Sequence, residues 1–259
     1  VTGLWDTWQD DAIIMNKSEG LFANQNKVRP LNYDGKYVSS KGPLTVPRSP
    51  QGHPVIMQAG QSDKGKEFAA KWGEIVFAVF KNQQEGKLIA KDIKSRAKKY
   101  GRNPEKIKIV TAAYVIPGET MQVAEDKKTF LESIAKPEDK LALLSELLNF
   151  DLGSLPREHI ITEKDLEEMS GARFPIEKLI REGREFTIGD LIEFSDRGTI
   201  HEFPVFCGTP ETIAQEMSSW YNSGSCDGFM IAATHIPGSY SDFVEQVVPK
   251  LQIIGTIRN

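Results

Sequence analysis

Short apolar runs alternate with charged segments of helical pattern through the middle of the chain. The runs PVIMQAG (54–60), EIVFAVF (74–80) and IKIVTAAYVIPG (107–118) each predict a strand, and two of them are almost continuously apolar, which is typical of strands buried on both faces of a parallel sheet. Between them, DKGKEFAAKWG (63–73) and NQQEGKLIAKDIKSRAKKYG (82–101) repeat apolar residues at helical spacing and end at a glycine. This alternation predicts an α/β fold with right-handed crossovers.

The alternation of apolar runs and helical segments stops after residue 118 and resumes near the C-terminus. Residues 119–204 are charged and mostly helical in pattern, so we expect a helical insertion there. A helix over 209–224, capped by Thr209, then precedes the apolar strand DGFMIAAT (227–234), and a helix over 240–255 closes the chain. We therefore predict four strands, which lie near residues 54, 75, 108 and 228.

The first 53 residues follow a different pattern. The chain opens on an apolar stripe at helical spacing, made of Val1, Leu4, Trp5 and Trp8. Because it reads as though it began within a helix, we expect that the start of a longer protein is missing. Gly, Pro, Ser and Asn are then dense across 9–53, which predicts an irregular loop region with extended pieces at Lys36–Ser39 and Leu44–Val46.

Composition sets limits on the class of protein. The 259 residues are 39% hydrophobic and 26% charged, with a net charge of -4, and we expect a single domain over 1–259. The mixed charges argue against nucleic-acid and membrane partners, and no apolar run approaches the ~20 residues that span a bilayer. Cys207 and Cys226 are too few for a disulfide framework, which favours a reducing, cytoplasmic location.

A small, polar turn follows the first strand of the repeating region. Gly60, Gln61 and Ser62 stand where the strand ends and the next helix begins. Small residues let a backbone approach a ligand, the first N–H groups of a helix attract anions, and a serine hydroxyl adds a donor. This pattern fits a phosphate site, but any strand–turn–helix corner favours Gly and Ser, so a purely structural role stays open.

Four segments together resemble the bacterial-luciferase-like flavin monooxygenases. They are VTGLWDTWQDDA, GPLTVPRSPQGHPVIMQAGQSDKGKEFAA, FCGTPETIAQEM and CDGFMIAATHIPGSYSDFVEQVVPKLQ. The most similar branch contains nitrilotriacetate, EDTA, dibenzothiophene-sulfone and long-chain alkane monooxygenases. The resemblance implies a TIM (β/α)8 barrel, of which this chain would be the C-terminal half, with four β/α units and the helical insertion.

The resemblance also implies a cofactor, FMN. Its phosphate would lie at Gly60, Gln61 and Ser62, with Gln58 and Ala59 under or beside the flavin ring. The family usually reads Gly-Ser-Ser at the turn, so Gln61 is a departure that puts the individual phosphate contacts in doubt.

Further site residues are expected on the same face of the barrel. Relatives often carry a histidine where this chain has His201, so we predict that His201 is catalytic, while a surface histidine in a linker is the alternative. Phe77, Phe80 and His235 are predicted to line the substrate pocket. No His, Cys or Asp cluster has the spacing of a metal site.

The function implied is that of a two-component monooxygenase. It would use FMNH2, supplied by a separate NAD(P)H-dependent flavin reductase, and O2 to oxygenate a small sulfur- or nitrogen-containing organic substrate. We expect a homo-oligomer, a dimer or a tetramer, in which 119–204 and 9–53 form a lid. Two alternatives remain: an inactive half-barrel fragment, and a TIM-barrel enzyme that binds another phosphate-bearing ligand such as a sugar phosphate.

Overall fold

The computed structural model describes residues 1–172 and 174–257. Contacts between Cα atoms divide the chain into two compact units, Val1–Met57 and Gln58–Asn259. The prediction of a single domain over 1–259 stays a prediction, because it concerns how the two units pack together. Among the described helices, none is long and apolar enough to cross a lipid bilayer.

The first unit consists of short elements joined by turns. In chain order they are α1 (Thr2–Trp5), β1 (Ile13–Asn16), β2 (Leu21–Ala23), the 3-10 turn η1 (Gln25–Lys27), β3 (Tyr33–Asp34) and β4 (Ser39–Ser40). Both strand pairs are antiparallel hairpins. The predicted N-terminal helix ends before Trp8, which forms a β-bridge with Val28 and whose indole N–H donates to the Leu44 carbonyl at 2.7 Å. The extended piece expected at Leu44–Val46 is not a strand.

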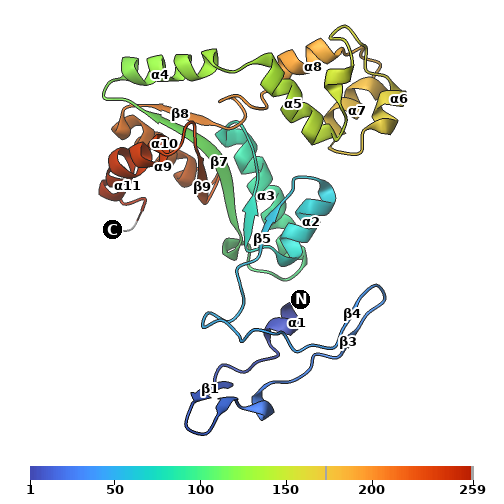
Figure 1. The fold of residues 1–259 in the computed structure, drawn as a ribbon. Helices are drawn as coiled ribbons and strands as arrows, with labels where there is room; N and C mark the ends of the chain where they lie inside the picture. The colour runs from blue at the N-terminus through green and yellow to red at the C-terminus, as the bar shows by residue number, and fades with distance from the viewer. Residues whose placement is uncertain (173, 258–259) are drawn as a thin grey trace. The chain divides into compact units, whose positions relative to one another are not determined.

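The second unit is built on a five-stranded sheet (Figure 1). Its strands are β5 (Met57–Ala59), β6 (Ile75–Phe77), β7 (Lys108–Pro117), β8 (Val205–Gly208) and β9 (Gly228–Ala232). β6, β8 and β9 each pair with β7, and all three pairings are parallel. The α/β prediction is confirmed, but the predicted four strands omitted β8, so the described sheet has five strand–helix units instead of four.

Helices cover one face of this sheet and enclose the main core. They are α2 (Asp63–Trp72), α3 (Gln83–Lys99), α9 (Pro210–Asn222), α10 (Gly238–Asp242), the π-helical turn η4 (Phe243–Val247) and α11 (Val248–Ile253), with the 3-10 turn η2 (Pro104–Lys106) before β7. Their apolar faces bury against alternate strand residues, such as Ile109, Ala113 and Val115 of β7. Trp220 of α9 and Phe206 of β8 meet edge to face in this core, with ring centroids 5.4 Å apart.

Residues 119–204 carry a second set of helices. They are α4 (Met121–Ser133), α5 (Pro137–Leu148), the 3-10 turn η3 (Leu152–Ser154), α6 (Glu163–Glu168), α7 (Phe174–Arg181) and α8 (Ile188–Phe194). α4 packs against β8, whereas α5, α6 and α8 contribute to a separate apolar core that includes Leu148, Leu166 and Ile188. That this segment is an insertion into a barrel stays a prediction.

Candidate functional site

The strands that pair with β7 have their C-terminal ends on the same side of the sheet, which is its C-terminal edge, but the ends are staggered along β7. β6, β9 and β8 run parallel to β7, and their last paired residues lie opposite Val110, Tyr114 and Pro117. The segment after β5 joins them, because Gln61 Nε2 donates a hydrogen bond of 2.8 Å to the carbonyl of Val79, just beyond β6. Ligands of open α/β sheets bind at this edge, so a ligand site is expected here.

Gly60, Gln61 and Ser62 form the corner between β5 and α2. Gly60 has φ +154°, a conformation that residues with a side chain rarely adopt. Ser62 is exposed and caps α2: its Oγ accepts a hydrogen bond of 3.1 Å from the Gly65 N–H, and its own proton can be donated to a ligand. The corner thus presents a hydroxyl donor and the positive end of a ten-residue helix, which suits an anion.

An ion-pair network neutralises the acidic first turn of α2. Arg96 of α3 lies 3.0 Å from the carboxylate of Asp63, and 2.8 Å from those of Glu67 and Asp92. Asp92 and Asp63 hold the pKa of the Arg96 guanidinium above its ordinary value, while the Arg96 hydrogen bond lowers the pKa of Asp92. An anion at the corner would therefore meet a paired carboxylate at Asp63.

Gln58 places an unpartnered acceptor beside the corner. Its Nε2 donates to the Ala59 carbonyl at 3.0 Å, but its Oε1 is buried and has no hydrogen-bond partner within the described residues. A Cβ on Gly60 would lie only 2.9 Å from Gln58 Nε2, so glycine makes room for this amide. Buried acceptors without partners are rare in native proteins, and this one would be satisfied by a donor on a ligand.

The two predicted pocket phenylalanines lie in different surroundings. Phe80 is 2% exposed and stacks on Trp220 of the main core, with ring centroids 5.9 Å apart. Phe80 thus packs in the main core, and its predicted role in the substrate pocket stays a prediction. Phe77 is partly exposed and is absent from that core, which takes the alternate residues Val76 and Ala78 of the same segment. Its role in the pocket stays a prediction.

His201 lies on the segment that leads into β8, so it precedes the N-terminal end of that strand, but it contacts Lys81 beyond the C-terminal end of β6. Its Nε2 is 3.2 Å from Glu132 Oε1 of α4, and its side chain is 53% exposed. Lys81, which follows β6, donates to the backbone carbonyl of His201 and pairs with Asp196 at 3.0 Å. These contacts fix the backbone of His201 at the strand ends and leave its ring within reach of solvent or a ligand; its catalytic role stays a prediction.

Sequence reasoning did not find Lys81 and Glu132. Both are separated from His201 by many residues, so no local pattern links them to it. The one available signal is that Lys81 is a charged residue directly after an apolar strand run, at the end where ligand sites form.

A cavity of about 430 Å³ opens at the C-terminal ends of β7 and β9. It is lined by residues of three segments: Val115, Ile116 and Pro117 of β7; Lys127, Phe130, Leu131 and Ile134 of α4 and its end; and Thr234, His235, Ser239 and Asp242 after β9. The predicted pocket residue His235 is thus one of the lining residues. This volume is in the range of small-molecule sites.

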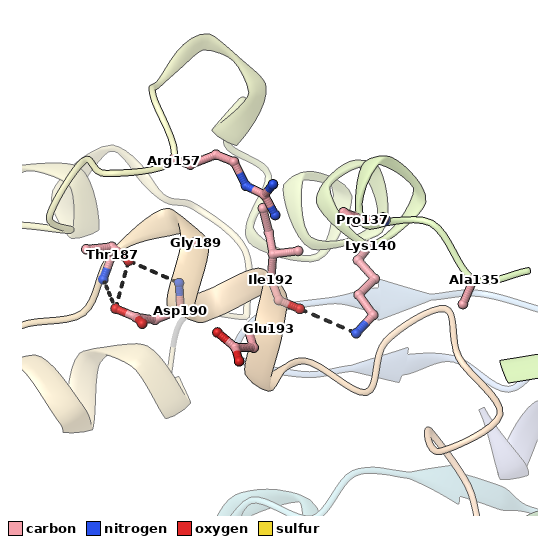
Figure 2. Close-up of a pocket in the computed structure, with 9 residues that line it drawn as sticks. All are labelled: Ala135, Pro137, Lys140, Arg157, Thr187, Gly189, Asp190, Ile192 and Glu193. Atoms are coloured by element: carbon pink, nitrogen blue, oxygen red, sulfur yellow. Dashed lines mark hydrogen bonds between the residues drawn. The ribbon is translucent and has the colours of Figure 1, made fainter. Parts of the chain in front are cut away.

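A second hollow, of about 530 Å³, lies among the helices of 119–204 (Figure 2). Two of its charged groups are held by the protein itself: Lys140 Nζ donates to the Ile192 carbonyl at 3.5 Å, and Asp190 forms the capping box of α8 with Thr187. It has no strand end in its lining. We therefore assign the candidate site to the edge of the sheet.

The burial of Cys207 argues against a redox role at this edge. Cys207 is the residue of β8 before Gly208, and burial raises the pKa of its thiol to about 11, with the Glu125 carboxylate acting in the same direction. A thiol with so high a pKa is neutral at physiological pH and a poor nucleophile.

Comparison with known proteins places this site in context. Residues 18–226 match the family described as luciferase-like monooxygenase. N-acetyl-S-(2-succino)cysteine monooxygenase of Bacillus subtilis (strain 168) is 37% identical over 261 residues, which cover 100% of this chain and 59% of the relative. Dibenzothiophene-sulfone monooxygenase of Rhodococcus erythropolis is 37% identical over 263 residues, or 100% of this chain and 57% of the relative.

One solved structure bears on the cofactor. The crystal structure of riboflavin lyase with modified FMN and riboflavin is similar with a TM-score of 0.77 and 27% identity, over 98% of this chain and 55% of that one. The chain spans somewhat more than half the length of each of these proteins.

Proposed function

The chain belongs to the luciferase-like monooxygenase family, as its sequence indicated, and from that membership we propose that it carries the FMN site of a monooxygenase. The protein would use reduced FMN and O2 to oxygenate a small organic molecule. The observation that carries this proposal is the corner after β5, where Gly60, Ser62 and the unpartnered acceptor of Gln58 lie together.

The donors at the corner fit the phosphate of FMN. The Ser62 hydroxyl and the first N–H groups of α2 would bind its oxygen atoms, and the absent side chain of Gly60 leaves the backbone open to approach. Gln61 has a different role, since its amide already donates to Val79 and thereby holds the ends of β5 and β6 together. The replacement of the family's usual serine would then remove one phosphate contact and add one structural bond.

The acceptor of Gln58 fits the rest of the cofactor. A flavin carries an N–H group and ribityl hydroxyls, and either could donate to the buried Gln58 Oε1. Such a bond would offset the cost of burying this oxygen without a partner, which is about 1–3 kcal/mol. Ala59, between Gln58 and Gly60, is exposed and leaves space beside the ring.

In the proposed reaction the cofactor would supply the oxygen chemistry, and the protein would move a proton and exclude water. When bound, reduced FMN would supply the electrons that activate O2, so that one oxygen atom reaches the substrate and the other leaves as water. His201, held at the strand ends and 3.2 Å from Glu132, would donate or accept a proton at Nε2. Residues 119–204, which include α4 at this edge, would help to exclude water.

The same premise extends to architecture and partners. We propose that the parallel sheet β5–β9 is part of the C-terminal half of a TIM barrel, whose C-terminal face carries the site. A separate flavin reductase would deliver FMNH2, as the resemblance to two-component monooxygenases implies.

Binding and turnover test the proposal in turn. Titration of the protein with FMN, followed by flavin fluorescence, is expected to show saturable binding that Ser62→Ala weakens. A coupled assay with a flavin reductase, NADH and FMN would then measure O2 consumption and product formation with thioethers and amines. Absence of FMN binding at full natural length would refute the proposal, and binding of a sugar phosphate in its place would favour another phosphate-dependent enzyme. FMN binding by the full-length protein but not by residues 1–259 would favour the inactive-fragment alternative for this chain.

A further inference from the structure

The cavity at the ends of β7 and β9 has the lining of an apolar binding site. We propose that this cavity, whose residues were given above, binds the substrate, and that the substrate is a neutral, largely apolar molecule with a single polar heteroatom, such as an aryl thioether. The inference rests on the proposed function, since it assigns the substrate class of that enzyme.

The walls of the cavity are hydrocarbon. The apolar lining comes from β7, with Val115, Ile116 and Pro117, and from α4 and its C-terminal cap, with Phe130, Leu131 and Ile134. Phe130 and Ile134 are 63% and 52% exposed in this chain, which is much for such large apolar side chains and leaves their surface available to a ligand. Burial of apolar ligand surface here would contribute about 25 cal/mol per Å².

The polar groups of the cavity are largely engaged within the protein. Lys127 Nζ donates to the Pro117 carbonyl at 2.7 Å, and Asp242 Oδ1 accepts from Gln246 at 3.1 Å. Ser239 Oγ donates to the His235 carbonyl at 2.6 Å. Lys127 and Asp242 also carry opposite charges, so the lining offers no excess of cations to a substrate with several carboxylates.

The His235 ring offers an uncharged polar contact to a heteroatom. Its Nδ1 lies 3.2 Å from Thr234 Oγ1, whereas its Nε2 has no hydrogen-bond partner in the described part of the chain. The ring rests against Gly238, where a Cβ would approach Nε2 to 2.4 Å. The position of the ring therefore depends on glycine at 238, and one imidazole suits one heteroatom.

The lining thus distinguishes two classes of substrate. A polycarboxylate would lose its hydration and meet one cation, Lys127, whose Nζ already donates to the Pro117 carbonyl, together with the carboxylate of Asp242. One cation beside one anion does not compensate several buried carboxylates, which is strongly unfavourable. A neutral thioether would lose little on leaving water and would gain the apolar contacts.

A direct binding measurement tests this without the cofactor. Titration of the full-length protein with 4-fluorothioanisole, followed by ¹⁹F NMR, is expected to show binding that iminodiacetate does not displace. Ile134→Arg places a cation in the wall and is expected to weaken binding by about tenfold or more. Val123→Arg is the matched control, because Val123 is also an exposed apolar residue of α4 but is not among the lining residues, and it should leave binding unchanged.

Two further variants test the cavity without introducing a charge that could unfold the protein. Phe130→Ala shortens an exposed wall residue and should weaken binding severalfold, and Gly238→Ala should do so by displacing the His235 ring; thermal melts would verify folding of each. Unchanged binding in Ile134→Arg and Phe130→Ala, or displacement of the probe by iminodiacetate, would overturn the inference.

The outcome is separable from that of the proposed function. Thioether binding with no FMN binding would refute the monooxygenase and leave the cavity assignment standing. FMN-dependent turnover of iminodiacetate, with none of thioanisole, would support the enzyme and refute this substrate class.

Discussion

Two strands of the sheet end in the same backbone geometry but in different surroundings. β5 is followed by Gly60 with φ +154°, and β8 ends at Gly208 with φ +152°. A hydroxyl residue then caps a helix in both places, Ser62 for α2 and Thr209 for α9. From local sequence alone, both corners would qualify as anion sites.

The two corners differ in the atoms that surround the glycine. A Cβ on Gly208 would lie 2.6 Å from Thr212 Oγ1 and 3.0 Å from Met121 Sδ, and Gly208 is buried. A Cβ on Gly60 would meet only the mobile end of Gln58 within 3 Å, and Ser62 is exposed. The same turn therefore serves packing at β8 and is open to a ligand at β5, so the glycine motif by itself does not mark a site.

The largest expected effect is a loss of protein stability when the corner after β8, here called the closed corner, is changed at Gly208. Gly208→Ala combines an unfavourable φ with contacts to Thr212 and Met121, and should lower the free energy of unfolding by about 3 kcal/mol. Urea denaturation would measure the change. Met121→Ala in the same background should recover part of the loss, and a cost under about 1 kcal/mol would contradict the packing role.

At the corner after β5, which is open to a ligand, substitution should cost little stability and much FMN affinity. Gly60→Ala meets backbone strain but only a side-chain amide in space, so we expect a loss of about 1–2 kcal/mol in stability. FMN affinity, measured by fluorescence titration, should fall by more than about tenfold because the methyl group occupies the approach to the corner. FMN binding as tight as in the parent protein would place the phosphate elsewhere.

The two caps form a matched pair of smaller changes. Ser62→Ala and Thr209→Ala each remove a cap hydrogen bond, worth about 1 kcal/mol of stability by chemical denaturation. FMN affinity should drop roughly tenfold in Ser62→Ala only, since the Ser62 hydroxyl is the proposed phosphate donor. Equal affinities in the two variants would remove the distinction between the corners.

Low pH should reduce the stability of the protein near the corner after β5, because it protonates the Asp92 carboxylate that joins α2 to α3. This carboxylate accepts from Arg96 at 2.8 Å and from Lys66 at 3.0 Å, which joins α2 to α3, and these bonds lower its pKa in the folded protein. A lowered folded pKa gives stability that is present above the unfolded value of about 4 and is lost as the pH falls through the folded value. Asp92→Asn should flatten the stability profile below about pH 4, as measured by denaturation at successive pH values.

The smallest effect concerns the thiol at the closed corner. Because burial raises the pKa of Cys207 to about 11, iodoacetamide should alkylate it slowly at pH 8 and faster as the pH approaches that value. Peptide mass spectrometry would follow Cys207 separately from Cys226. Rapid alkylation at pH 8 would show that the β8 corner opens.

Much of the sheet could be predicted because most of its strands lie in long apolar runs. The runs that became β5, β6, β7 and β9 are visible in the sequence for this reason, whereas β8 has four residues between polar stretches and is a strand only through pairing with Tyr114–Pro117. The same continuous apolarity hides the orientation of Phe77 and Phe80, since EIVFAVF gives no sign of which alternate residues face the helices.

The parts of the candidate site that consist of residues adjacent in the sequence could be predicted. Gly60 to Ser62 is a contiguous motif, so its corner could be foreseen, and His235 directly follows a strand. The contact of His201 with Glu132, the bond from Gln61 to Val79 and the plugging of Gly208 by Met121 join distant parts of the sequence. Such contacts depend on the fold, and a single sequence contains no pattern for them.

The length of β7 has a consequence for cooperativity. This ten-residue strand pairs with β6 through Lys108–Val110, with β9 through Val110–Tyr114 and with β8 through Tyr114–Pro117. Any local opening that frees β7 must therefore release three other strands at once. We therefore expect local opening to be limited to the short strand tips and loops, while the centre of the sheet opens as one unit.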